Sequence, residues 1–212
     1  MSEIGDLTIG VTKAALSTIP AISPFITIWD SLKSGEYKRR ADNFVQDIES
    51  RLDFMRDIEL DRLKQNQLFA TVLYISGQLA IKTNDEKRKL LANAVVNTAT
   101  TTLSEDRVVI LLNCFEKYTL QHLRMLRFLH NPSEYTTRDF SFTGGSPASI
   151  YEDYYRESER DLDRIIIRDL YQDGLSSVDS IHVNVSSAGV LQKKTTTLGD
   201  DFITFFGIEK DV

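Results

Sequence analysis

The chain has 212 residues, of which 42% are hydrophobic and 26% are charged, and its formal net charge is −6 at pH 7. This length can bury a hydrophobic core and is typical of one or two ordinary globular domains. The negative charge argues against a surface covered in nucleic-acid contacts, although it leaves room for a local basic patch.

The first predicted element is an apolar stretch over residues 7 to 32. Up to residue 29 it holds a single charged residue, Lys13, and basic residues follow it, as they do at the cytoplasmic flank of a membrane segment. Pro20 and Pro24 divide the stretch into two helices, each too short to span about 30 Å of hydrocarbon. Two interpretations stay open: a buried helical hairpin, or a hairpin that associates with a membrane or inserts into it.

The compartment is predicted from two further features. Glu3 and Asp6 stand where a secretory signal would carry basic residues. A single cysteine, Cys114, excludes an intramolecular disulfide framework and indicates a reducing compartment. We therefore expect a cytoplasmic protein, with membrane association through residues 7 to 32 as the alternative.

Residues 36 to 63 are expected to form a long helix, because apolar residues recur there every three or four positions while acids and bases fill the other face. The apolar face suits a helix of the same chain, or a second copy in a coiled-coil-like homodimer. The apolar face of residues 65 to 82 predicts another helix. Together with the apolar hairpin, these elements would make an N-terminal helical bundle over residues 1 to 100.

Three short amphipathic helices are predicted between residues 83 and 132. Thr83 and Glu86 have the spacing of a capping box at the start of the first. Ser104 and Thr119 are suited to cap the second and third helices, and Pro132 follows the end of the third. These helices are too short to be stable alone, so other elements must pack on them.

Residues 133 to 157 are expected to be an inserted loop. Ser, Thr and Gly dominate its first part, and the run from Gly144 to Pro147 is typical of a break between elements. Aromatic residues are interspersed, among them Tyr135 and Tyr151. They either pin the loop onto the bundle, which is the more common role of such side chains, or form a partner surface.

The last part of the chain predicts a helix, a hairpin and a final helix. The helix runs from residue 158 to residue 173 and ends at Gly174, a natural C-cap. Residues 181 to 185 alternate between apolar and polar, which predicts a half-buried strand, and residues 190 to 195 are expected to return as its partner. Leu198 and the phenylalanines after it give the final helix an apolar face.

The order of three helices followed by a hairpin is similar to a winged-helix domain with a loop inserted before its third helix. We therefore expect a mainly α fold, with an N-terminal helical bundle followed by a winged-helix-like α+β module over residues 101 to 212. The resemblance implies that the third helix would be the reading helix and that the hairpin would be the wing.

No constellation of residues predicts catalysis, a metal or a cofactor. His122 and His130 are eight positions apart, without an accompanying cysteine pair. Cys114 lies beside Phe115 on a buried-looking helix, where an inert thiol is expected. The run Gly144-Gly145-Ser146 lacks the lysine of a phosphate-binding loop. We therefore expect a protein that is not an enzyme.

An arginine ladder is the clearest candidate binding feature. Arg156, Arg160, Arg164 and Arg168 recur every four residues, and Lys193 and Lys194 would stand on the wing. Guanidinium groups in such a row suit phosphates or an acidic partner.

The competing interpretation is a solvated face whose charge is neutralised by interleaved acids (Glu152, Glu157, Asp161 and Asp163). Between Glu159 and Val212, six Lys/Arg residues stand against ten Asp/Glu residues. This balance disfavours nucleic acid and favours a protein partner.

Three stretches resemble uncharacterised bacterial helical proteins, and some related-looking families are associated with abortive infection and phage defence. The stretches are Glu86 to Asn97, Leu120 to Pro132, and Thr196 to Gly199 with Phe202 and Phe205 after it. The absence of a catalytic constellation and the wing-like hairpin lead us to expect a non-enzymatic bacterial interaction protein that binds a partner through its C-terminal module. The resemblance implies a link to phage defence or its regulation. Two alternatives stay open: a membrane-acting effector that inserts residues 7 to 32, and a winged-helix DNA-binding regulator.

Overall fold

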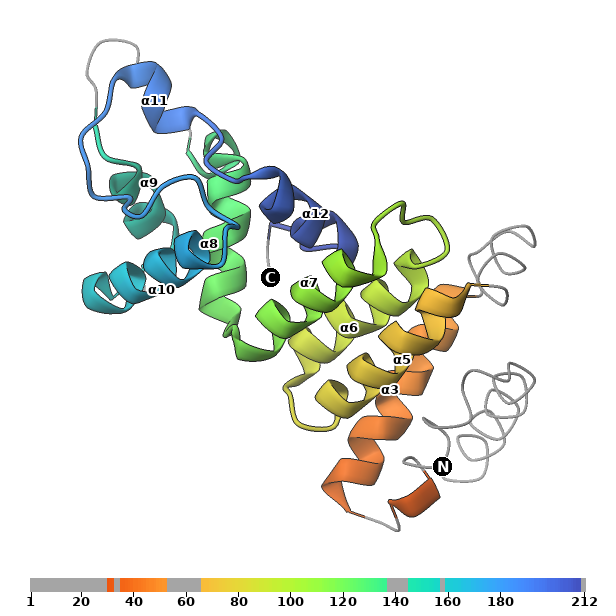
Figure 1. Cartoon of the computed structure of the whole chain (residues 1–212). Coiled ribbons are helices and arrows are strands. Elements are labelled where there is room, and N and C mark those ends of the chain that lie inside the picture. Colours follow the sequence, from red (N-terminus) through yellow and green to blue (C-terminus); the bar gives the residue numbers. More distant parts are fainter. Residues whose placement is uncertain (1–29, 33–34, 53–65, 137–144, 157–158, 211–212) are drawn as a thin grey trace. The chain divides into compact units, whose positions relative to one another are not determined.

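The computed structural model describes residues 30–32, 35–52, 66–136, 145–156 and 159–210. Within these ranges the chain is mainly α-helical, which confirms the expected fold class at that level (Figure 1). The chain divides into two compact units. The first holds residues 1–116 and 205–207, and the second holds residues 117–204 and 208–212. Residues 101–116 thus belong to the first unit, whereas the sequence analysis assigned them to the C-terminal module.

The first unit contains the helices α3 (Glu36–Leu52), α5 (Gln67–Ala80), α6 (Asp85–Asn97) and α7 (Glu105–Lys117). Helices α3, α5 and α6 pack against one another (Figure 1). Large apolar side chains fill the space between them, and the ring of Phe115 stacks on that of Phe206 with centroids 4.2 Å apart. Burial of this apolar surface is the main force that stabilises the unit.

Side-chain caps begin the helices of the first unit, with one correction to the expected positions. Asn84, and not Thr83, caps α6: its Oδ1 accepts a hydrogen bond from the backbone N–H of Lys87 at 3.0 Å. The predicted capping box is wrong by one residue, because Asn is as good an N-cap as Thr and sits one position closer to the helix. The Ser104 hydroxyl accepts from the N–H of Arg107 at 3.4 Å, which confirms the predicted cap of α7.

Arg88 ties α6 to α3 through a buried guanidinium group. Its Nε donates to Asp47 Oδ2 on α3 at 2.8 Å, and its Nη1 donates to Asp85 on α6. The Arg88 residue is 5% exposed. A buried charge of this kind is tolerated because both of its partners are carboxylates.

The second unit is built from five α-helices and a 3₁₀ turn within its described residues. They are α8 (Leu120–His130), η2 (Pro132–Tyr135), α9 (Pro147–Tyr154), α10 (Arg160–Gln172), α11 (Ser187–Leu191) and α12 (Thr197–Phe206), whose last two residues are grouped with the first unit. Helix α8 packs against α10, and η2 packs against α9 (Figure 1).

The expected loop over residues 133 to 157 is in part helical, which corrects that prediction. Ser146 caps α9, its hydroxyl accepting from the N–H of Ala148 at 3.1 Å, and Pro147 occupies the first turn. Serine followed by proline begins a helix as readily as it breaks one, since the backbone N–H that proline lacks would have no partner in the first turn in any case. The start of α9 was therefore mistaken for a break in the chain.

Tyrosines of the predicted loop are packing anchors. Tyr135 and Tyr151 are buried, and their rings lie edge-on to Phe128 of α8 at centroid distances of 5.5 Å and 5.2 Å. Their contacts confirm the interpretation that aromatic side chains pin this part of the chain onto the helices. Phe140 and Phe142 lie outside the described residues.

The predicted hairpin over residues 181 to 195 is wrong, and the expected winged-helix β element is therefore not formed. Val185 makes an isolated bridge to Gly145, and Thr195 makes one to Ser176. Between them lies α11, which begins where the Ser186 hydroxyl accepts from the N–H of Gly189 at 3.3 Å. Ser186 and the small residues after it form a helical turn. The serine side chain caps this turn by accepting from an N–H group that, in a strand, would bond to a neighbouring strand.

Parts of two predictions fall outside the described residues. They are residues 7 to 29 of the apolar stretch and residues 53 to 63 of the predicted long helix, whose described part is α3. In the ranges that are described, no helix has both the length and the apolar character needed to cross a membrane. The homodimer through residues 36 to 63 and the membrane insertion of residues 7 to 32 both stay predictions.

Candidate protein-interaction surface

The predicted arginine ladder lies mostly on α10. Arg156 precedes this helix in a turn, while Arg160, Arg164 and Arg168 lie on it, and all four are exposed. At 3.6 residues per turn, the three helical arginines and Tyr171 fall on one arc of about 80°. The structure therefore brings three of the predicted site residues together with a tyrosine that the sequence analysis missed. Its spacing, three positions after Arg168, is the signal by which it could have been found.

The opposite face of α10 is buried. Ile166, Ile167 and Leu170 are 0–1% exposed and pack toward the core of the second unit. Helix α10 is amphipathic, and burial of this apolar stripe fixes which side chains face outward. Ile165 and Tyr171 are the exceptions, being apolar yet 57% and 48% exposed.

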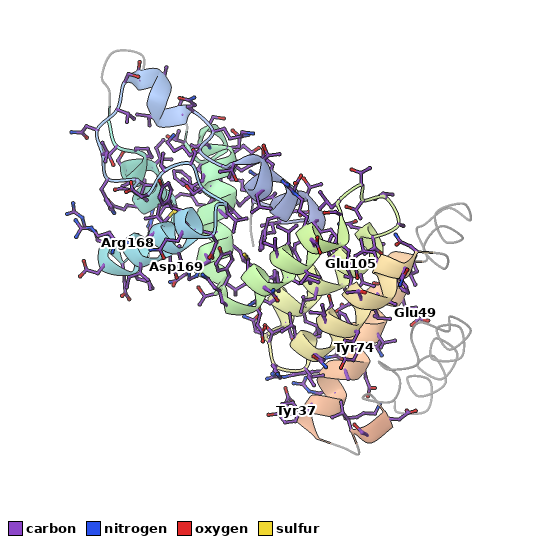
Figure 2. The ribbon with its side chains drawn as sticks, in the orientation of Figure 1. Tyr37, Glu49, Tyr74, Glu105, Arg168 and Asp169 are labelled. Atoms are coloured by element: carbon purple, nitrogen blue, oxygen red, sulfur yellow. The ribbon has the colours of Figure 1, made fainter. Side chains whose placement is uncertain are left out.

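Apart from the exposed Asp161, the described acids interleaved with the arginines do not share their face. Asp163 is buried at 4% exposure, and Asp169 lies against α8 (Figure 2). Glu152 lies 4.0 Å from His182, and Glu157 lies outside the described residues. Of the acids that the structure describes, only Asp161 comes within ion-pair distance of the α10 arginines, at 3.8 Å from Arg164.

The outer arc of α10 is thus basic, although the helix carries as many acids as bases. We call the side chains of Arg160, Arg164, Arg168 and Tyr171 the α10 arc. The arginine face was alternatively interpreted as neutralised by interleaved acids. For Asp163 this interpretation is wrong, because its buried carboxylate does not neutralise guanidinium groups that face solvent. On this arc, exposed guanidinium groups stand beside exposed apolar surface.

His122 holds α10 in this orientation from α8. Its Nδ1 accepts from the backbone N–H of Thr119 at 3.2 Å, and its Nε2 lies 3.4 Å from Asp169 Oδ2. The imidazole is 7% exposed and stacks on the ring of Tyr118 with centroids 4.9 Å apart. Burial lowers the pKa of His122 below its usual value, against the opposing effect of Asp169. His122 is thus a buried capping residue.

A second tie joins the start of α8 to the end of α10. The Tyr118 hydroxyl donates to Asp173 Oδ2 at 2.5 Å, and Lys117 Nζ lies 2.6 Å from the same oxygen. Both polar contacts therefore lie at the same end of the pair, where the start of α8 meets the last turn of α10.

Lys193 and Lys194, which were expected on the wing beside the arginine ladder, are not on a wing. Lys193 Nζ pairs with Asp200 Oδ2 at 2.6 Å. Lys194 is 7% exposed, and its ammonium group donates to the carbonyls of Gly189, Val190 and Gln192 at 2.8, 3.2 and 2.6 Å. Burial lowers the pKa of Lys194 to about 8. Lys194 is a structural residue that ends α11, and it adds no exposed cation to the arc.

A small pocket opens beside Tyr171. Its volume is about 310 Å³. It is lined by Pro147, Tyr171, Ser177, Val178, Asp179, Ser180, Val183, Val185 and Lys194. Tyr171 belongs both to this pocket and to the α10 arc, so the basic surface leads to a concave site.

The polar side chains around His130 gather at Asp200. His130 Nδ1 lies 3.0 Å from Asp200 Oδ1, and the Thr195 hydroxyl donates to the same oxygen at 2.5 Å. The same hydroxyl also lies 3.4 Å from His130 Nδ1. Both groups contact Asp200 at the start of α12. Across the residues that the structure describes, no cluster of three or more His, Cys, Asp or Glu side chains is suited to a metal.

No protein-family model, curated protein or solved structure matches this chain. The resemblance to bacterial helical proteins with phage-defence associations therefore stays a prediction from the sequence. The α10 arc and the pocket beside it are therefore the basis for proposing a function.

Proposed function

We propose that this protein is a non-enzymatic interaction protein that binds a partner protein through the outer face of α10 in its second unit. The observation that carries the proposal is the separation of charge on this helix. Asp163 and Asp169 face the core or α8, while Arg160, Arg164 and Arg168 face solvent. Arginine and tyrosine are enriched at the centres of protein interfaces, and α10 presents both on one arc.

A protein partner is favoured over nucleic acid because the two lysines that were expected on the wing do not extend the arc. Lys193 is paired with Asp200, and Lys194 is buried. A DNA-binding surface needs a broad basic footprint and an element that enters a groove. Without the expected wing, the winged-helix regulator loses the basis on which it was predicted.

The phage-defence role and the membrane-acting alternative both stay predictions. The first rests on the resemblance of the sequence, and efficiency of plating on bacteria with and without the protein tests it. The second rests on residues 7 to 32. Liposome flotation of the full chain beside a chain that starts at Glu36 tests it, and failure of both to float ends that idea.

Site-specific photo-crosslinking tests the proposed interaction surface. A photoreactive amino acid replaces Gln172, which is exposed on α10, and in a matched control it replaces Lys89, which is exposed on α6. Both proteins are expressed in the cells that make this protein naturally, and adducts are identified by mass spectrometry. We expect a defined adduct from the α10 position and none from the α6 position.

The crosslinked partner is then purified and its affinity measured by calorimetry. Arg160→Ala/Arg164→Ala/Arg168→Ala is expected to weaken binding by about a hundredfold, since truncation of a central arginine typically costs more than about 1 kcal/mol. The control is Arg39→Ala/Lys82→Ala/Lys89→Ala, which removes the same charge from exposed positions of the first unit. Equal loss of affinity in both triple variants, or no adduct at Gln172, would refute the proposed surface.

A further inference from the structure

We infer that the partner recognised by α10 is an acidic protein segment with one large apolar side chain, which enters the pocket beside Tyr171 while its carboxylates pair with Arg160, Arg164 and Arg168. This inference rests on the proposed function and specifies the chemistry of the partner. Two observations support it independently: the lining of the pocket and the charge of the arc that leads to it.

The pocket suits a single side chain. Its volume of about 310 Å³ lies at the lower limit of the range of about 300–1,000 Å³ that small-molecule sites occupy. Its walls carry Pro147, three valines (Val178, Val183 and Val185) and the ring of Tyr171. Val183 is 58% exposed and Tyr171 is 48% exposed, so an apolar occupant would cover surface that now faces water.

The polar residues of the pocket are largely engaged within the protein. The Ser177 hydroxyl donates to the carbonyl of Lys194 at 2.9 Å, and the Ser180 hydroxyl accepts from the N–H of His182 at 3.2 Å. The ammonium of Lys194 is held by three backbone carbonyls. A polar ligand would have to break these bonds, whereas an apolar side chain leaves them intact.

The charge of the arc selects an acidic segment. Arg168, Arg164 and Arg160 lie about 5, 11 and 17 Å from Tyr171 along the helix axis, at about 1.5 Å per residue. Among the described residues, the structure gives Arg160 and Arg168 no carboxylate within ion-pair distance, so both can receive one from a partner. Arginine binds carboxylates through two parallel N–H groups, which adds geometric specificity to the attraction.

Asp179 gives the segment a direction. It is exposed and lines the pocket. A carboxylate next to Asp179 would be repelled, whereas all three arginines precede Tyr171 along α10, so the acids of the partner should lie on the arginine side of the apolar anchor. An extended segment covers about 3.3 Å per residue, so the acids should fall within about five residues of the anchor on one side.

Synthetic peptides test the inference on the full chain. The probe is a fluorescein-labelled peptide with one leucine or phenylalanine, followed by glutamates and glycines over about five positions. Matched peptides replace the anchor by serine, or the glutamates by lysines. Fluorescence anisotropy at several salt concentrations should show binding of the first peptide, about tenfold weaker binding without the anchor, and none of the lysine peptide.

One exposed valine and one exposed isoleucine provide a matched pair of protein variants. Val183→Asp places a charge at the pocket, while Ile110→Asp places the same charge on α7 of the first unit, where Ile110 is 48% exposed. Because both residues are exposed, neither change is expected to unfold the chain. We expect about tenfold weaker peptide binding for Val183→Asp and unchanged binding for Ile110→Asp.

Each outcome decides the inference. Binding that depends on the anchor, on the glutamates and on Val183 supports it. Binding of acidic peptides that ignores the anchor overturns the role of the pocket, and the absence of binding by any acidic peptide overturns the whole inference. If the crosslink at Gln172 persists while no peptide binds, the proposed function stands with a partner of other chemistry. If both fail, both are refuted.

Discussion

The Nε2 atom of His122 on α8 lies 3.4 Å from the Oδ2 atom of Asp169 on α10. Asp169 is thereby held on the side of α10 that faces α8, and Arg168, its neighbour in sequence, is exposed (Figure 2). Successive residues of a helix are rotated by about 100°, so a contact made by one fixes the direction of the next. This contact separates the charges on which the proposed interaction surface depends.

The stability of the second unit should fall in mild acid because of His122. Burial lowers the pKa of this imidazole below 6.5, its usual value. Between the lowered pKa and about 6.5 the unfolded chain binds more protons than the folded chain, so stability is complete above about pH 6.5 and is lost as the pH falls below it. Each unit by which the pKa is lowered corresponds to about 1.4 kcal/mol.

Urea unfolding at about pH 7.5 and about pH 5.5 measures this dependence. His122→Gln should reduce it, because Gln cannot titrate and still accepts a hydrogen bond from Thr119 in a capping box. Asp169→Asn should steepen it, since Asp169 is the group that raises the pKa of His122. If His122→Gln showed the same pH dependence as the unchanged protein, the buried imidazole would not be its source.

The ion pairs of Arg88 should contribute unequally to the first unit. The Asp47 side chain is 18% exposed and that of Asp85 is 66% exposed, while both contact the same buried guanidinium. Leaving a buried charge wholly uncompensated costs about 3–5 kcal/mol, and the loss on removing Asp47 should be part of this because the exposed Asp85 remains. An exposed pair contributes about 0–1 kcal/mol.

Asp47→Asn should therefore destabilise the chain far more than Asp85→Asn, as measured by denaturant unfolding. Asp42→Asn on the same helix is a suitable control, because Asp42 pairs with the partly exposed Lys38. Similar losses for Asp47→Asn and Asp85→Asn would contradict the role assigned to burial.

Gly199 should not tolerate a side chain. A Cβ at this position would overlap the carbonyl oxygen of Leu175, which already accepts from the N–H of Thr196 at 3.0 Å. Since the obstacle is backbone, the start of α12 would have to move, and overpacking of this kind costs about 1–3 kcal/mol. Thermal unfolding of Gly199→Ala should show this loss, whereas Gly189→Ala, whose nearest neighbour is a valine side chain at 3.2 Å, should lose less.

Local features of the sequence predicted the helices well where one interaction decides the outcome. Ser104 was expected to cap α7 and does so, because serine before an acidic first turn has few competing roles. The prediction of a hairpin over residues 181 to 195 was wrong, because alternation over five residues is a weak signal. Ser186 and Gly189 favour a helical turn there, and the carbonyls of that turn need the ammonium of Lys194. These contacts span only two to five residues, but they have no periodicity that a sequence reveals.

The candidate site could be predicted in part. The four-residue spacing of the arginines correctly placed Arg160, Arg164 and Arg168 on one face of a helix. The net charge of the region was misleading, because a tally counts the buried Asp163 as if it faced solvent. The pocket was not predictable, since its walls come from segments that only the tertiary fold brings together with Tyr171.

The last prediction concerns nucleic acid, for which a row of arginines is often taken as a signature. Each phosphate contact contributes about one unit to the slope of log affinity against log salt, so three arginines alone would give a slope of about three and weak binding. Lys193 and Lys194 do not add to this, since one is paired with Asp200 and the other is bound to backbone carbonyls. The second unit also lacks, within its described residues, the paired strands of a wing.

We therefore expect no measurable affinity for random duplex or single-stranded DNA at physiological salt. The measurement is fluorescence anisotropy at several salt concentrations on the unchanged protein and on Arg160→Ala/Arg164→Ala/Arg168→Ala. Weak binding at low salt that is the same in both proteins reflects general electrostatic attraction and leaves the expectation intact. Binding that persists at physiological salt and is lost in the triple variant would assign the α10 arc to nucleic acid, because only direct phosphate contacts give such a dependence.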